Sequence, residues 1–123
     1  MLDTAEYQKQ PDTFEILHTN LSHGTATLLA ISYQTNPNIN KFSFTLRQMI
    51  TQLQVYIQQK SFSDEFKKVK DFINILKSKL LDMGRYIANI NSGDSRRYDF
   101  NWLRQKVSEL KDLLMSPLQI AQA

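Results

Sequence analysis

The amino-acid sequence predicts an all-α protein, a compact antiparallel bundle of four to five helices. Apolar residues recur at helical spacing in four stretches of the chain. The 123 residues include only three glycines and three prolines, which are too few for a turn-rich β fold. The four stretches are separated by short polar loops, and short loops place successive helices antiparallel.

The helical bundle is expected to occupy residues 12–115. Residues 1–11 are polar and end at Pro11, so they are expected to form an N-terminal arm or a short additional helix. Residues 116–123 are expected to be a C-terminal tail, because Ser116 is followed by Pro117 and proline does not continue a helix.

The first two helices are expected at residues 12–33 and 43–59. Asp12 is the expected N-cap of the first, and Gly24 is a candidate bend or break within it. Residues 35–41, "TNPNINK", read as a loop, because the position before Pro37 disfavours helix. The second helix is expected to begin at Ser43 or Thr45.

The third helix, expected from residue 61 to 90, has the most regular pattern. Its apolar residues step alternately by four and three: Phe62, Phe66, Val69, Ile73, Leu76, Leu80, Met83, Ile87 and Ile90. This spacing is typical of a helix in a bundle. Ser61 and Asp64 resemble a capping box at its start, and Gly93 is the expected left-handed residue at its end. Asp99 is the expected N-cap of a fourth helix.

Composition and terminal sequence indicate a cytoplasmic protein with no membrane partner. The chain contains no cysteine, which excludes disulfides and thiolate metal sites and fits a reducing compartment. The first ten residues lack the apolar core of a secretory signal, and the best apolar run, "ATLLAIS" at 26–32, is too short to span a bilayer.

The sequence lacks the motifs of enzymes and metal sites. His18 and His23 are five residues apart and so do not share a helix face as a zinc pair would. The acidic residues of the third helix alternate with lysines at salt-bridging spacing, as on a solvated face. There is no glycine-rich phosphate loop and no nucleophile elbow. We expect no enzymatic activity, metal, cofactor or small-molecule substrate.

The placement of charge favours a polyanionic partner. No acidic residue lies between Glu15 and Asp64, whereas Lys41, Arg47 and Lys60 lie in that interval. From residue 64 onward, eleven Lys and Arg accompany eight Asp and Glu. An acid-free stretch with a positive balance suits nucleic acid, although an ordinary solvated surface explains the same charges.

An antiparallel bundle would bring the basic residues of distant segments to one end. The start of the second helix and the connection between the third and fourth lie at the same end of such a bundle. Seven residues there are candidate phosphate contacts: Lys41, Arg47, Arg85, Arg96, Arg97, Arg104 and Lys106. Tyr86, Tyr98 and Trp102 lie near them and could stack on an unpaired base, but covering the core is the favoured role for Tyr86 and Trp102.

Two local sequences resemble the small subunits of CRISPR effector complexes, and the resemblance extends over the helical body. They are "SFTLRQMI" (43–50) and "LLDMGRYI" (80–87), which contain Arg47 and Arg85. The resemblance implies a helical subunit that contacts neighbouring subunits and holds guide RNA, target or displaced strand with basic side chains. It implies that role for Arg47 and Arg85 and, by position, for Arg96 and Arg97.

A second resemblance is to the four-helix accessory proteins of diversity-generating retroelements. It lies in "FSFTLRQMI" and "YDFNWLRQKVSELKDLL", although Arg47 stands where those proteins have glycine. Both resemblances imply nucleic-acid binding without catalysis.

The sequence thus predicts a non-catalytic nucleic-acid-binding subunit of a ribonucleoprotein complex, with the choice between RNA and DNA left open. The alternative is a helical adaptor or chaperone that binds only protein. The glutamine-rich segment "TQLQVYIQQK" (51–60) suits docking against a partner subunit in either case.

Overall fold

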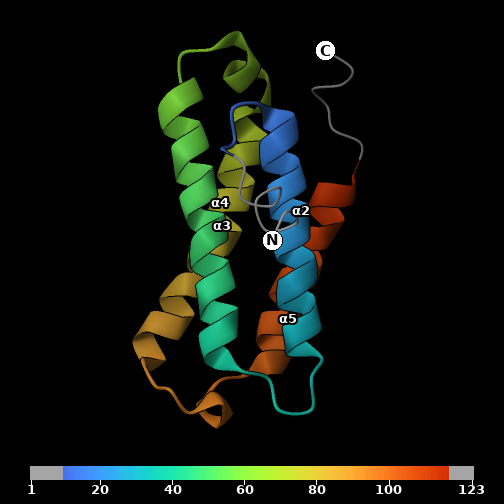
Figure 1. Ribbon diagram of the computed structural model, residues 1–123, viewed down its shortest axis with the longest axis vertical. Coiled ribbons are helices and arrows are strands. Elements are labelled where there is room, and N and C mark those ends of the chain that lie inside the picture. Colours follow the sequence, from blue (N-terminus) through green and yellow to red (C-terminus); the bar gives the residue numbers. More distant parts are fainter. Residues whose placement is uncertain (1–9, 117–123) are drawn as a thin grey trace.

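The computed structural model describes residues 10–116, which form a four-helix bundle (Figure 1). The helices are α2 (Phe14–Ser32), α3 (Ile39–Lys60), α4 (Asp64–Ile90) and α5 (Phe100–Met115), with a 3-10 turn, η1 (Ser95–Arg97), before α5. Successive helices run antiparallel and pack on one another, and α5 also packs on α2, which closes the bundle. The predicted all-α bundle is confirmed, whereas most of the predicted arm and tail lies outside the described residues.

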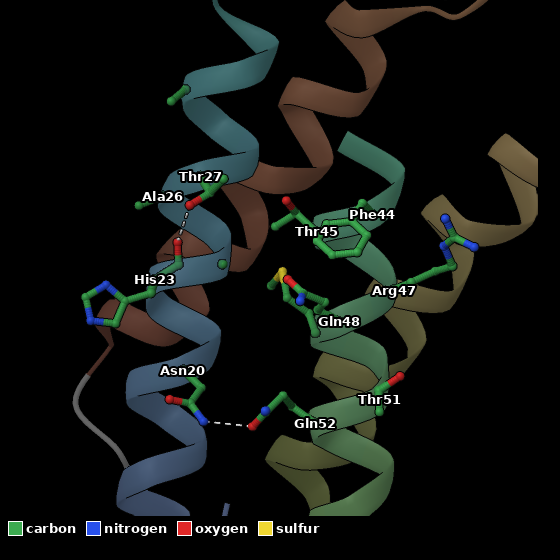
Figure 2. Close-up of a pocket in the computed structure, with 13 residues that line it drawn as sticks. Asn20, His23, Ala26, Thr27, Phe44, Thr45, Arg47, Gln48, Thr51 and Gln52 are labelled. Atoms are coloured by element: carbon green, nitrogen blue, oxygen red, sulfur yellow. Dashed lines mark hydrogen bonds between the residues drawn. The ribbon is translucent and has the colours of Figure 1, made fainter. Parts of the chain in front are cut away.

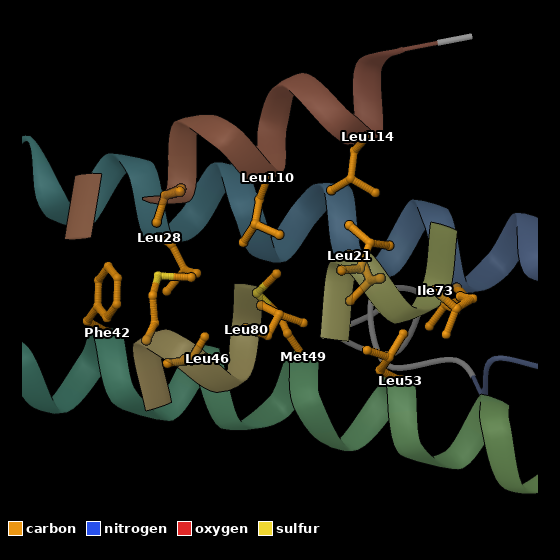
Figure 3. Close-up of a cluster of buried hydrophobic side chains, with 14 of the residues drawn as sticks. Leu21, Leu28, Phe42, Leu46, Met49, Leu53, Ile73, Leu80, Leu110 and Leu114 are labelled. Atoms are coloured by element: carbon orange, nitrogen blue, oxygen red, sulfur yellow. The ribbon is translucent and has the colours of Figure 1, made fainter. Parts of the chain in front are cut away.

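The core is a continuous set of apolar side chains contributed by all four helices (Figure 3). The stripe predicted for α4 is buried from Phe66 to Met83. Phe62, which the same spacing placed in the core, is 96% exposed. That prediction is wrong because α4 begins at Asp64, so Phe62 lies in the preceding turn, where helical spacing does not apply.

Each helix begins at a polar side chain that accepts a hydrogen bond from the first turn. Thr13, not Asp12, caps α2, and its Oγ1 accepts from the Ile16 amide at 3.2 Å. Asn38 caps α3, which therefore begins at Ile39, four residues before the predicted start at Ser43.

The cap of α4 also differs from the prediction, whereas that of α5 does not. Ser63, rather than Ser61, caps α4 through a 3.1 Å bond from the Phe66 amide. Asp99 caps α5, as predicted, by accepting from the amides of Asn101 and Trp102 at 3.0 and 3.1 Å.

The left-handed residue at the end of α4 is Asn91, with φ of 45°, and not Gly93. Asparagine tolerates this conformation better than most residues do, because its short polar side chain can bond locally. The last helix ends where it was predicted to end. Its final residue is Met115, and Ser116 is its C-cap.

Gly24 neither bends nor breaks α2, which is continuous from Phe14 to Ser32. A Cβ atom at Gly24 would lie 2.6 Å from Cγ and 2.7 Å from Sδ of the buried Met49 on α3. The absence of a side chain therefore lets Met49 pack directly against the α2 backbone. Gly24 is a close-approach residue and not a hinge.

Two polar contacts tie the first described helix to later ones. His18 is partly buried, and its Nε2 donates to the carbonyl oxygen of Leu114 at 2.7 Å. The Glu65 carboxylate accepts from the Phe14 amide at 3.0 Å and from the Tyr56 hydroxyl at 2.7 Å. Burial and the nearby Glu65 raise the pKa of Tyr56 well above its usual range, so it stays a hydrogen-bond donor.

Candidate nucleic-acid interface

The two connections that contain three of the seven predicted basic residues, Lys41, Arg96 and Arg97, lie together at one end of the bundle (lower part of Figure 1). We call this the loop end, formed by residues 33–41 and 91–99. The Ile39 amide donates to Ser95 Oγ at 2.9 Å, which joins the start of α3 to η1. The prediction that the start of the second helix shares an end with the last connection is therefore confirmed.

The aromatic side chains predicted near this end serve the fold. The Tyr98 hydroxyl donates to the carbonyl oxygen of Ser92 at 2.7 Å and accepts from the Ser92 amide at 2.8 Å, and Tyr98 is 7% exposed. The Tyr86 hydroxyl accepts from the Asp99 amide at 2.7 Å, and the Tyr86 ring centroid lies 4.7 Å from that of Trp102. Tyr86 and Trp102 pack against the core, as favoured, and Tyr98 is not available for stacking.

Arg104 forms a clamp between the first and last described helices. Its Nη2 donates to the carbonyl oxygen of Ser32 at 2.6 Å, and Nη1 donates to Asn101 Oδ1 at 3.0 Å. Its guanidinium carbon also lies 4.5 Å from the centroid of the Tyr33 ring. The bond to Ser32 satisfies a buried carbonyl in the last turn of α2, where helix carbonyls lack a partner within the helix. We therefore assign Arg104 a structural role.

Lys106 is likewise engaged within the protein. Its Nζ lies 5.5 Å from the Trp102 ring centroid and 3.9 Å from Glu109 Oε1. Glu109 also accepts from Lys79 Nζ at 2.9 Å. The hydrogen bond from Lys79 and the two positive charges hold the pKa of Glu109 below its usual range.

Arg85 and Arg96 are exposed but paired. Arg85 Nη2 lies 2.8 Å from Asp82 Oδ1. Arg96 donates through Nε and Nη2 to the two carboxylate oxygens of Asp94, both at 3.1 Å. Hydrogen bonding from Arg96 lowers the pKa of Asp94, and the same pairing raises the pKa of Arg96. Pairs this exposed contribute little to stability, so an incoming phosphate can compete for either arginine.

The three remaining candidates are free of such pairing. Lys41, Arg47 and Arg97 are exposed, and their side chains form no ion pair or hydrogen bond with any residue in the range 10–116. Of the seven predicted contacts, these three are the cations that the described part of the fold leaves uncommitted.

Arg47 stands between two grooves on the surface of α3. The α2–α3 groove has a volume of about 920 Å³ and is lined mainly by small and neutral polar side chains. The α3–α4 groove has a volume of about 330 Å³ and reaches the loop end at Asn91 and Ser92. Arg47 lines both. Figure 2 shows its side chain on the α4 side of α3, while the Phe44 ring lies toward α2.

The surface around Arg47 has no carboxylate from α3, and none from α2 beyond Glu15. All of α3, and α2 beyond Glu15, fall within the acid-free stretch of the sequence. A positive side chain there is not neutralised by acidic neighbours on the same helices. The arrangement can attract and hold an anion without first breaking an internal ion pair.

Phe44 is an exposed residue of α3 for which the sequence pattern predicted no role. It is 57% exposed and lines the α2–α3 groove. The exposure of Phe44 can be inferred from the sequence only when the start of α3 at Ile39 is known. The buried stripe is then Ile39, Phe42, Leu46, Met49, Leu53 and Tyr56, and Phe44 falls outside it.

Within residues 10–116 no group of three or more His, Asp or Glu side chains is placed to hold a metal ion. None of the helices in this range combines the length and apolar character that a bilayer crossing requires. Comparison of the chain with protein-family models, curated proteins and solved structures finds no match.

Proposed function

We propose that this protein is a non-catalytic nucleic-acid-binding subunit that grips a phosphate backbone at the loop end and along α3. The single observation that supports this most is Arg47, an exposed cation with no partner among the described residues, on an acid-free face between two grooves. Lys41 and Arg97 extend the uncommitted positive charge to the loop end.

Phosphate contacts need only placed cations and neutral donors, and no base-reading motif. Arg85 and Arg96 would join the interface by exchanging their carboxylate partners for phosphate. Arg104 and Lys106, which hold the fold together, would contribute only through long-range attraction. Membership in a ribonucleoprotein assembly, as in a CRISPR effector complex, is the form of this function that the sequence resemblance implies.

The test is a fluorescence-anisotropy titration of labelled single-stranded RNA and DNA at several salt concentrations. We expect Arg47→Ala to weaken binding about tenfold and to reduce the salt slope by about 0.7, the value for one lost phosphate contact on a single strand. Arg97→Ala should behave similarly, whereas Arg96→Ala should have a smaller effect because Arg96 starts out paired with Asp94.

Lys70→Ala is the matched control, since Lys70 is an exposed cation on α4 nearer the opposite end of the bundle. Equal losses from Lys70→Ala and Arg47→Ala would show general attraction without a defined interface. If wild-type protein binds neither nucleic acid at low salt, the proposal is wrong.

The rival function is a helical adaptor that binds only protein. It is favoured by the exposed apolar side chains Phe62 and Met115, which are 96% and 71% exposed. In that case Phe62→Ala and Met115→Ala should weaken capture of a partner protein, while nucleic acid should have no effect on it.

A further inference from the structure

We infer that the α2–α3 groove receives an unstacked base of a single strand, with the base against Phe44 and the adjoining phosphate near Arg47. This inference rests on the proposed function and makes it more specific, because it names a single strand, not a duplex, as the ligand. It also places base recognition in the α2–α3 groove, a part of the surface that the positions of the basic residues do not by themselves indicate.

Phe44 is the exposed aromatic best placed for this role. Among described residues the large exposed aromatics are Tyr33, Phe44 and Phe62. One face of Tyr33 is covered by the Arg104 guanidinium at 4.5 Å. Phe62 lies in the turn between α3 and α4, at the opposite end from the loops. Phe44 therefore combines an open ring with the acid-free face.

The spacing of Phe44 and Arg47 suits one nucleotide. Residues three apart on a helix are surface neighbours with Cβ atoms about 5–6 Å apart. Their side chains leave α3 on the α2 and α4 sides respectively (Figure 2). A strand that crosses α3 could thus place a base on the ring and its phosphate at the guanidinium.

The α2 wall of the groove leaves room for a flat ring. Asn20 and His23 line this wall at one end, and the rest of it is formed by the small residues Gly24, Ala26, Thr27 and Ala30. Its volume of about 920 Å³ lies within the range of small-molecule sites. A bulky wall would have closed the space in front of Phe44.

The polar groups of the groove are neutral and can bond the edge of a base. The Gln48 amide lines the groove and is exposed, with no hydrogen bond to a residue that the structure describes. Gln52 Oε1 accepts from Asn20 Nδ2 at 2.7 Å, which fixes the Gln52 amide across the floor (Figure 2). Amides of this kind suit bases, whose edges are uncharged donors and acceptors.

A duplex cannot use this groove in the same way, because its bases are covered on both faces by stacked neighbours. Stacking on an aromatic side chain needs a base that is already unpaired. We therefore expect a preference for single strands that depends on Phe44, in addition to a backbone affinity that depends on Arg47.

The experiment compares Phe44→Ala with wild type on a labelled DNA strand and on the duplex of the same sequence, at one salt concentration. The expected result is a loss of about tenfold in affinity for the single strand and little change for the duplex. Phe62→Ala, which removes a more exposed phenylalanine ring from the other end of the bundle, is the control and should change neither affinity. Phe44→Tyr should retain binding, because it keeps the ring.

Phe44→Trp gives a readout that a purely structural role would not produce. The emission of a tryptophan at this position should be quenched by the single strand and not by the duplex. If Arg47→Ala weakens binding but Phe44→Ala matches Phe62→Ala, the inference is overturned and the proposed function stands. If wild type binds no nucleic acid at all, both are overturned.

Discussion

The two halves of the bundle use charge in opposite ways. In the α4–α5 half, acidic and basic side chains neutralise one another through pairs such as Lys79–Glu109 at 2.9 Å and Arg85–Asp82 at 2.8 Å. In the α2–α3 half, the region from residue 16 to 63 has three Lys and Arg and no carboxylate. The α4–α5 half also has cations without an ion pair, such as Lys70 and Arg97, but they lie among carboxylates. The cations of the α2–α3 half lie on a stretch of the chain that has none.

This contrast shows why a count of basic residues is a poor guide to an interface. Arg104 lies at the predicted end of the bundle and has the right chemistry, but the Ser32 carbonyl and the Tyr33 ring already occupy it. Arg47, an isolated cation in sequence, has no such commitment among the residues that the structure describes. What distinguishes them is the set of contacts each makes, not the charge.

The strongest test of the contrast is Arg104→Ala. We expect it to lower the free energy of unfolding by about 2–3 kcal/mol, because the buried Ser32 carbonyl loses a charge-assisted hydrogen bond. Chemical denaturation measures this loss. Arg85→Ala, which breaks an exposed pair, is the control and should change stability by at most about 0.5 kcal/mol. If Arg104→Ala left stability unchanged but weakened nucleic-acid binding, Arg104 would be part of the interface and not a structural residue.

Substituting the two helical glycines, Gly24 and Gly84, should change the free energy of unfolding by less than Arg104→Ala does. The two changes should have opposite signs. A Cβ atom at Gly24 would press on Met49, so Gly24→Ala should destabilise the fold by about 1 kcal/mol, since overpacking outweighs the gain in helix propensity. At Gly84 the nearest atom to a new Cβ would be Ile50 Cδ1 at 3.7 Å, an ordinary contact. Gly84→Ala should therefore stabilise by up to about 1 kcal/mol.

Thermal unfolding of both variants measures the difference. If Gly24→Ala and Gly84→Ala shifted the Tm equally and in the same direction, α2 and α3 would not pack as closely as the position of Met49 indicates.

The smallest expected effect is the pH dependence of stability that comes from the ion pairs of the α4–α5 half. Because the pKa of Glu109 is lowered from its ordinary value of 4.5, its contribution is fully present above that value and is lost as the pH falls through the folded-state pKa. Glu109→Gln should cost a few tenths of a kcal/mol near pH 7, since solvent screens the partly exposed pair.

The difference between wild type and Glu109→Gln should disappear at acidic pH. Denaturation at pH 7 and at a series of pH values below 4.5 checks this. A difference that persists at acidic pH would mean that Glu109 stabilises the fold by packing rather than by charge.

The sequence was sufficient for the architecture because each helix has a repeated apolar pattern, most clearly from Phe66 to Met83. It was less reliable at the helix ends, where one side chain decides the outcome. Asn38, Ser63 and Asn91 each displaced a predicted boundary or terminal residue by a local hydrogen bond or backbone conformation. Asp99 was predicted correctly, because an acid directly before an apolar stripe has few alternative roles.

The candidate site was predictable only in its location. Antiparallel topology placed the basic residues at one end, but the partner of Arg104 is a backbone oxygen 72 residues away, for which the sequence has no marker. The exposure of Phe44 depended in turn on where α3 begins. Pairing and exposure are properties of the packed helices and not of local spacing.

The contact of the first described helix with the last has a consequence for how the chain is made. Arg104 donates to the carbonyl oxygen of Ser32, and the carbonyl oxygen of Leu114 accepts from His18, so α2 is completed by residues that are synthesised after α3 and α4. Until α5 emerges, the side of α2 that α5 covers stays open to solvent or to other proteins. Full burial of the core therefore waits until α5 has been synthesised, and a chain that stops before α5 would expose part of that core.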